Sequence, residues 1–137
     1  MSATDPAAVV AAYYTALRAG DVESWLAVFS PHAEVTNPAG TPPVSGPVAL
    51  RELWEELTCP FRGLDVTEDL VRLTAAGAAV KWTVRGVPWA GEPVSAEGID
   101  VFETDGAGRI ITLSSYWDPS HVRDQLCRCP SSTPDGA

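Results

Sequence analysis

Apolar residues recur at the spacing of a helix face in the first part of the chain. The first such stretch follows Asp5-Pro6, a pair typical of an N-cap and a first helical residue, and it stops at Gly20. A proline ends a second, short stretch, and a third one begins at Pro47. The pattern therefore predicts three helices, at about residues 6–19, 21–29 and 47–59.

After these helices the period of the pattern changes to two, which is typical of strands with one buried face. Short glycine-containing segments separate the runs and have the composition of hairpin loops. We expect strands at about residues 63–73, 78–87, 93–103 and 109–118, and a further extended segment at 33–37 before a Pro- and Gly-rich loop. Helices followed by an antiparallel meander predict an α+β fold. One domain is expected over residues 1–126, and a disordered tail over 127–137.

One face of the predicted strands is almost wholly apolar and should line an interior cavity. Asp100 interrupts that face, whereas Glu97 and Glu103 in the same run fall on the opposite one. A carboxyl group in apolar surroundings has a raised pKa, so Asp100 is predicted to stay protonated and to donate a hydrogen bond. The alternative is an aspartate at a strand end that bends out to water.

Tyrosines on the first helix add a second polar group to the apolar interior. Tyr13 lies on the helix stripe with Val9 and Leu17, and a buried tyrosine hydroxyl needs a partner. It is either a core residue bonded to the backbone or part of a site. Tyr14 is displaced by about 100 degrees around the helix, so we expect it to be structural or partly exposed.

Five short motifs, in this order and spacing, resemble the ketosteroid isomerase branch of the NTF2-like (SnoaL-like) superfamily. They are Y-x-x-A-L-x-A-G-D at 13–21, V-x-N-P-x-G-x-x-P-x-S-G at 35–46, I-D-x-F at 99–102, G-A-G-R-I-I at 106–111 and S-Y-W at 115–117. The resemblance implies a cone in which three N-terminal helices pack on a curved antiparallel sheet around an apolar pocket. It also implies that Tyr13 and Asp100 form an oxyanion hole, which stabilises the charge that develops when a ketone becomes an enolate.

Position 37 departs from the family pattern. The isomerases carry an aspartate base there, whereas this chain has Asn37, whose amide cannot take up a proton at neutral pH. Glu68 shares the apolar parity of its run and is either a replacement base or an ordinary rim acid. Trp54 stands where the family has a tyrosine partner. The chemistry has changed, another base is used, or the pocket only binds.

The leading hypothesis is an isomerase or cyclase that acts on a small apolar ketone, either steroid-like or a polyketide, with Asn37 orienting the substrate. The alternatives are a non-catalytic protein that binds small hydrophobic ligands and a variant epoxide hydrolase or epoxide-opening cyclase. The residues expected to line the pocket are Phe29, Val35, Trp54, Phe61, Trp82, Val84, Phe102, Leu113, Ser115 and Trp117.

Composition and charge disfavour several classes of binding partner. The chain of 137 residues has nine Lys and Arg against eighteen Asp and Glu, and a net charge of −9 disfavours nucleic acid and anionic lipid surfaces. No apolar run reaches membrane-span length, no cofactor motif occurs, and Cys127 and Cys129 lack zinc-site spacing, so neither a metal nor a cofactor is expected. The start resembles no secretory signal, and an odd count of three cysteines suits a reducing cytoplasm.

The outer face of the predicted sheet is too apolar for plain solvent exposure. Members of the family that the chain resembles commonly dimerise through this face, which implies a homodimer here. The residues concerned are Lys81, Thr83, Arg85, Ile99, Val101, Ile110 and Tyr116.

Overall fold

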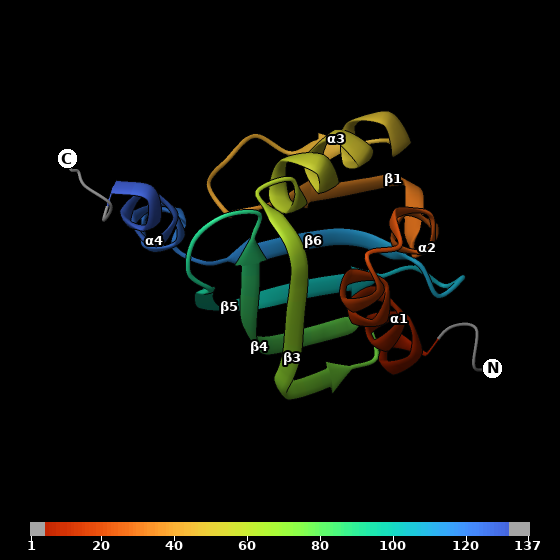
Figure 1. The fold of residues 1–137 in the computed structure, drawn as a ribbon. Coiled ribbons are helices and arrows are strands. Elements are labelled where there is room, and N and C mark those ends of the chain that lie inside the picture. The colour runs from red at the N-terminus through yellow and green to blue at the C-terminus, as the bar shows by residue number, and fades with distance from the viewer. Residues whose placement is uncertain (1–4, 132–137) are drawn as a thin grey trace.

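The computed structural model describes the backbone of residues 5–131 and the side chains of residues 5–126. The helices are α1 (Pro6–Ala19), α2 (Val22–Ala27), α3 (Pro47–Thr58) and α4 (Pro119–Ser131). The strands are β1 (Phe29–Thr36), β2 (Val44–Ser45), β3 (Phe61–Thr74), β4 (Gly77–Pro88), β5 (Val94–Thr104) and β6 (Ile110–Tyr116). In Figure 1, α4 lies at one end of the sheet, and α1 and α2 lie at the other.

The boundaries of the first two helices follow from capping. The Asp5 side chain accepts a hydrogen bond from the Ala7 N–H (3.0 Å), and the Asp21 side chain accepts one from the Ser24 N–H (3.1 Å). Gly20 ends α1 in the left-handed conformation with φ of 67°, which an L side chain rarely adopts. The two helices are therefore joined by a tight turn at Gly20 and Asp21, and they contact each other.

Six strands form one sheet in the order β2-β1-β6-β5-β4-β3. Strands β3 to β6 make the predicted antiparallel meander, and β1 joins it in parallel beside β6. The register places Asp100 of β5 opposite Val80 of β4 on one side and Ser115 of β6 on the other. The fold is the expected α+β cone.

An aromatic cluster joins the helices to this sheet. The Trp25 ring of α2 lies 4.8 Å from the Phe29 ring and 5.2 Å from the Trp54 ring of α3, between centroids. Tyr13 of α1 meets Phe102 of β5 edge to face at 5.1 Å. Aromatic pairs in these tilted geometries add to the stabilisation that burial provides. They fix the helices above the sheet and so shape the cavity.

Several features depart from the sequence analysis. Helix α2 ends at Ala27 and β1 begins at Phe29, which was expected in the second helix, and β2 lies in the segment expected to be a loop. Helix α4 was not predicted, although the Asp118 side chain accepts from the Ser120 N–H (2.9 Å) just as Asp5 does at the start of α1. It runs on to Ser131, into the segment expected to be a tail, of which residues 132–137 lie outside the described range. Ile110, expected on the outer face, is 0% exposed, because a register shift at the start of β6 turns it inward. None of the described helices is long and apolar enough to cross a membrane.

Candidate active site

A cavity of about 340 Å³ lies between the helices and the sheet, within the usual size range of ligand sites. Apolar and aromatic side chains make up most of its wall, which includes Trp54, Phe61, Trp82, Val84 and Trp117 as the sequence predicted. The polar side chains in the wall are Tyr13, Tyr14, Asn37, Glu56, Thr58, Asp100, Ser115 and Arg123.

Four predicted wall residues belong instead to the core. Phe29, Val35, Phe102 and Leu113 are buried, but they lie outside the cavity lining. Their alternation along the strands correctly predicted an inward orientation. Phe29 and Phe102 pack against aromatic rings of α1 and α2, and Val35 and Leu113 pair with each other within the buried core.

Asp100 is the central polar residue of the cavity. It is 3% exposed, and its two carboxyl oxygens are each 2.5 Å from a hydroxyl oxygen, Tyr14 Oη at Oδ2 and Ser115 Oγ at Oδ1. Tyr14 itself is 1% exposed, so of the two alternatives expected for it, structural or partly exposed, partial exposure is wrong. We call Asp100, Tyr14 and Ser115 the carboxyl cluster.

The number of protons in the carboxyl cluster determines what it can do. When Asp100 is ionised, the two hydroxyl protons serve the two short contacts, and none is left for the cavity. When Asp100 is neutral, the cluster holds three protons for the same two contacts. One O–H is then free to donate to a ligand. With a neutral Asp100 the cluster can therefore donate a hydrogen bond to a ligand. With an ionised Asp100 it can instead take up a proton.

Burial raises the pKa of Asp100 above its ordinary value, and the hydrogen bonds from Ser115 and Tyr14 offset this only in part. Burial likewise raises the pKa of Tyr14 and of Tyr13, and the Asp100 charge adds to both effects. For all three groups the direction of the pKa shift favours the neutral form. A set of neutral O–H donors suits the stabilisation of an oxyanion.

Tyr13 also lines the cavity, beside the carboxyl cluster. Its ring lies 4.9 Å from the Tyr14 ring, and its hydroxyl is near enough to Trp25 for the indole N–H to lower the hydroxyl's pKa slightly against the effect of burial. The Trp25 indole N–H can only donate, and it makes no hydrogen bond in good geometry among the described residues, so it does not compete for the Tyr13 O–H proton. Tyr13 is therefore a second donor into the cavity.

Trp82 lies on the far side of Asp100. Its indole N–H is buried without an acceptor in bonding geometry among the described residues, yet it is near enough to Asp100 to lower the pKa of that carboxyl. Gly98, directly across from Trp82 on β5, makes room for the ring: a Cβ at position 98 would lie 2.2 Å from Trp82 Cζ2. Gly98 thus allows Trp82 to lie over β5, two residues from Asp100.

Asn37 is held by a second tryptophan. Trp117 Nε1 donates to Asn37 Oδ1 at 2.6 Å, and both residues line the cavity. Asn37 follows Thr36, which pairs with Ser114, so Asn37 lies beside Ser115. Asn37, Ser115 and Asp100 therefore form a row across β1, β6 and β5.

Glu68 does not reach the cavity lining. Its carboxylate forms an ion pair with Arg18 of α1 at 2.5 Å, and the same guanidinium donates to the Val66 carbonyl. Parity alone placed Glu68 on the cavity side, but Arg18 holds it at the sheet edge. A register shift between Glu68 and Leu70 then turns Leu70 out to solvent. The hypothesis that Glu68 is a replacement base is not supported by this arrangement.

Sequence reasoning missed two parts of the site. Tyr14 was passed over because adjacent helix residues point in different directions, but α1 lies so that both Tyr13 and Tyr14 face inward. The α4 residues in the wall, Val122, Arg123 and Leu126, were missed with their helix. The Asp118-Pro119 pair was a signal for that helix.

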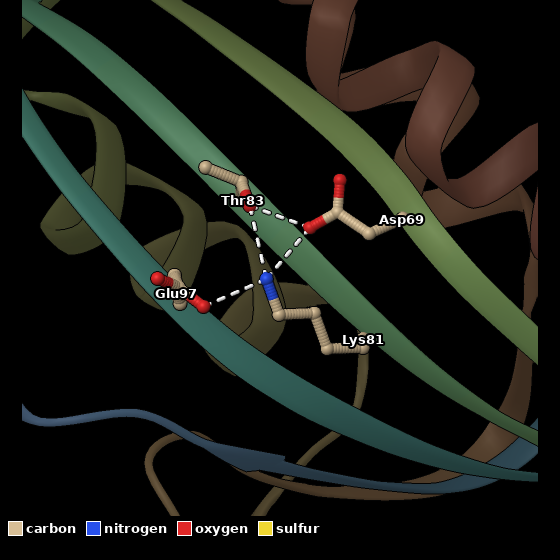
Figure 2. A network of polar contacts seen from close by, with 4 residues as sticks. All are labelled: Asp69, Lys81, Thr83 and Glu97. Atoms are coloured by element: carbon tan, nitrogen blue, oxygen red, sulfur yellow. Dashed lines mark hydrogen bonds and ion pairs between the residues drawn. The ribbon is translucent and has the colours of Figure 1, made fainter.

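The outer face of the same strands carries a different polar network, shown in Figure 2. Lys81 Nζ lies 2.8 Å from Asp69 Oδ2 and 2.7 Å from Glu97 Oε1, and Thr83 Oγ1 donates to Asp69. Hydrogen bonds from Lys81 and Thr83 lower the pKa of Asp69. This network is open to solvent and contains paired charges, in contrast to the carboxyl cluster.

No group of three or more His, Cys, Asp and Glu side chains that could hold a metal ion occurs among the described residues. The thiols of Cys127 and Cys129 lie outside the side chains that the structure describes.

The structure thus combines a cone fold with an apolar cavity whose wall carries a few fixed polar groups. The chain belongs to the SnoaL-like domain family, whose model matches residues 10–113. A steroid Delta-isomerase from Nocardioides simplex is 30% identical over 116 residues, which cover 84% of this chain and 91% of that protein.

Two solved structures are similar in fold. An LEH-like epoxide hydrolase from M. tuberculosis superposes with a TM-score of 0.75 at 20% identity, over 96% of each chain. The Delta 5-3-ketosteroid isomerase from Mycobacterium sp. superposes with a TM-score of 0.72 at 23% identity, over 85% of this chain and 95% of that one. At these identities the likeness establishes the fold and leaves the activity to the residues of the site.

Proposed function

We propose that this protein is an isomerase or cyclase that acts on a small apolar ketone and stabilises its enolate or polarised carbonyl with Tyr13 and the neutral carboxyl cluster. The observation that carries this proposal is the pairing of both Asp100 oxygens with hydroxyls at 2.5 Å in the wall of an apolar cavity. Two neutral donors then converge where a ketone oxygen would gain charge. The similarity to a steroid Delta-isomerase supports the same chemistry.

The reaction proceeds without a carboxylate base at position 37. Of the acids in the described cavity wall, Asp100 is buried in the cluster and Glu56 is exposed. Cyclisation suits this arrangement better than isomerisation of a simple ketone. A polyketone with an acidic carbon between two carbonyls enolises readily, so polarising one carbonyl promotes intramolecular addition with little help from a base.

The site does not favour epoxide hydrolysis by an Asp-Arg-Asp set of catalytic side chains. Arg85 is exposed and lies outside the cavity lining, and Arg123 is the arginine in the described wall. Ser115 is already engaged with Asp100. A water nucleophile would therefore have no separate ionised carboxylate beside it in the described wall.

The test restores a base and asks whether the donors work. Asn37→Asp is expected to isomerise a β,γ-unsaturated 3-ketosteroid to its conjugated isomer at least about 100-fold faster than the wild type, since only the variant can shuttle the proton. Adding Tyr13→Phe should remove about 100-fold or more of that rate. Tyr14→Phe is the matched control, because it deletes a neighbouring hydroxyl that contacts Asp100 rather than the ketone, and its loss should be smaller.

Two results would overturn the proposal. One is an Asn37→Asp variant that binds the ketosteroid in a fluorescence titration but converts it no faster than the wild type. The other is equal loss from Tyr13→Phe and Tyr14→Phe. In the first case the protein is better described as a binder of hydrophobic ligands that has no catalytic donors.

We also propose that the protein is a cytoplasmic homodimer. Ile99, Val101 and Tyr116 are exposed on the outer face of the sheet, which supports association through that face, and Cys59 is an exposed free thiol, which suits a reducing compartment. Light scattering at micromolar concentration should give twice the mass of the chain. The monomer mass would contradict the dimer.

A further inference from the structure

The orientation of the Asn37 amide is fixed by its partner. Trp117 Nε1 donates at 2.6 Å, and an indole nitrogen has no lone pair with which to accept, so the atom that faces it is the amide oxygen. The amide nitrogen, with its two protons, therefore points away from Trp117. No hydrogen-bond partner for it occurs among the described residues, although Asn37 lines the cavity. Asn37 thus presents a donor where an aspartate would present an acceptor.

This donor lies apart from the donors already described. Asn37 is beside Ser115, and Ser115 is beside Asp100, so two strand spacings, roughly 10 Å, separate position 37 from Asp100 along the row. The Ala39 N–H donates to the Ser115 carbonyl (2.6 Å), which ties the segment after Asn37 to β6 and holds this spacing. The wall that the two share also contains Trp82 and Val84, and it is mainly apolar.

We propose that the cavity takes a ligand with two acceptor oxygens on an apolar frame, one held by Tyr13 and the carboxyl cluster and the other, a carbonyl, held by the Asn37 amide N–H. This inference rests on the proposed function for the first oxygen and adds the second. Asn37 is half-buried, and its amide N–H has no partner among the described residues, so a ligand carbonyl that meets it gains a hydrogen bond within a mainly apolar wall. The substrate class is therefore a dicarbonyl compound.

Trp117 makes the Asn37 position selective for a ligand group that accepts a hydrogen bond. As long as its N–H holds Oδ1, a 180° flip of the amide would set the Asn37 NH2 group against the indole N–H, and two donors would face each other. A ligand hydroxyl that needs an acceptor at this position would have to share the amide oxygen with the Trp117 N–H, whereas the amide N–H is unshared among the described residues. A carbonyl fits, and an apolar group of the same shape leaves the donor unpaired.

Two ligands of nearly equal shape test the inference. Both 6-acetyl-2-naphthol and 6-isopropyl-2-naphthol place a phenol in the oxyanion hole, but only the first brings a carbonyl to the far end. The readout is the ratio of their dissociation constants, measured by fluorescence titration in the wild type, Asn37→Asp and Asn37→Leu. The acetyl group also makes the phenol more acidic, but this effect is common to all three proteins and cancels when their ratios are compared.

The preference for the acetyl compound is expected to fall about fivefold or more in Asn37→Asp and in Asn37→Leu, the value of one hydrogen bond. Asn37→Asp is the variant that keeps the shape of the side chain and its contact with Trp117, so a folding defect cannot account for its result. Trp117→Phe should lower the preference by less, because it frees the amide to rotate but leaves the donor in place.

Each outcome has a separate meaning. An unchanged ratio in Asn37→Asp, with both compounds bound, overturns the second oxygen and leaves the oxyanion hole untouched. Failure of the wild type to bind either naphthol overturns the inference and the proposed function together. A reduced ratio in both Asn37 variants, together with a loss of affinity for both naphthols in Tyr13→Phe, supports the two-oxygen ligand.

Discussion

The two faces of the sheet formed by β3, β4 and β5 each carry an aspartate with polar neighbours. The pKa of the outer aspartate is lowered, and that of the inner one is raised. On the outer face Asp69 is paired with Lys81, and its pKa is lowered chiefly by the hydrogen bond from that lysine. On the inner face Asp100 is paired with Tyr14 and Ser115, and its pKa is raised by burial. Both aspartates have polar neighbours that lower the pKa. Burial and the absence of a cation beside Asp100, among the described residues, decide the difference.

The contrast explains how a strand can hold a neutral acid close to ordinary ionised ones. Glu97 and Asp100 differ in parity, so the pleat sends one into solvent beside Lys81 and the other into the cavity. Hydroxyl donors offset only part of the cost of moving a carboxylate away from water. The inner face therefore favours a proton donor, and the outer face favours a salt bridge.

Of the differences between the two faces, we expect the largest effect on stability from the close packing of Trp82 against Gly98 on the inner face. Gly98→Ala places a Cβ 2.2 Å from Trp82 Cζ2 and 2.6 Å from the Tyr116 carbonyl oxygen, so the ring must move away from Asp100. We expect a loss of about 1–3 kcal/mol in the free energy of unfolding, measured by urea denaturation. Glu97→Ala, one residue away on the outer face, is the matched control and should change stability much less. Equal effects would mean that the Trp82 ring is not constrained by Gly98.

The next difference concerns pH. Because the folded pKa of Asp100 is raised, the native state binds more protons than the unfolded state between the ordinary value of 3.8 and the raised one. The wild type should therefore lose stability relative to Asp100→Asn as pH rises through that window, by about 1.4 kcal/mol for each pH unit between the two pKa values. Urea denaturation of both proteins at several pH values measures this.

Asp69→Asn, on the outer face, is expected to show the opposite dependence of stability on pH. The pKa of Asp69 is lowered, so its ionised form stabilises the wild type above 3.8, and this advantage disappears as pH falls through the lowered value. The two difference curves should therefore slope in opposite directions. Parallel curves for Asp69→Asn and Asp100→Asn would remove the contrast between the faces.

The smallest effect is expected from the outer network. Lys81→Met removes the cation that Asp69 and Glu97 share, but these groups are open to water, where ion pairs contribute little. The variant should show a small decrease in Tm at low salt and none at high salt, because salt screens exposed charges. A large decrease that persists in high salt would show that the network is a structural element of the sheet.

Much of the fold was predictable because its signals are local. Asp5-Pro6 and Gly20 set the ends of α1, and the change of period from 3.6 to two marks where the sheet begins. The same alternation singled out Asp100 as an inward acid, and the structure confirms its burial. The sequence singled out Asn37 as a departure from the family pattern, and the structure places Asn37 in the cavity wall.

What could not be predicted depends on contacts between distant segments. Tyr14 joins the carboxyl cluster because of how α1 lies on β5, which the helix period alone does not fix. Glu68 shares the parity of the cavity face, but Arg18, 50 residues earlier in the chain, holds it at the edge. The inward position of Ile110 depends on a register shift between β5 and β6. The alternation of apolar and polar residues along a strand contains no information on these contacts or on the register shift.

The neutral state of Asp100 is the central claim, and infrared difference spectroscopy of wild type against Asp100→Asn tests it most directly. The spectra are recorded across a pH titration, with Asp69→Asn as the outer-face reference. The account predicts that the carbonyl stretch of a protonated carboxylic acid assigned to Asp100 persists well above pH 3.8, the ordinary aspartate value, while the Asp69 carboxylate stays ionised below it. An Asp100 signal that ionises at or below that value would contradict the account, because the cluster would then have no proton to donate to a ketone.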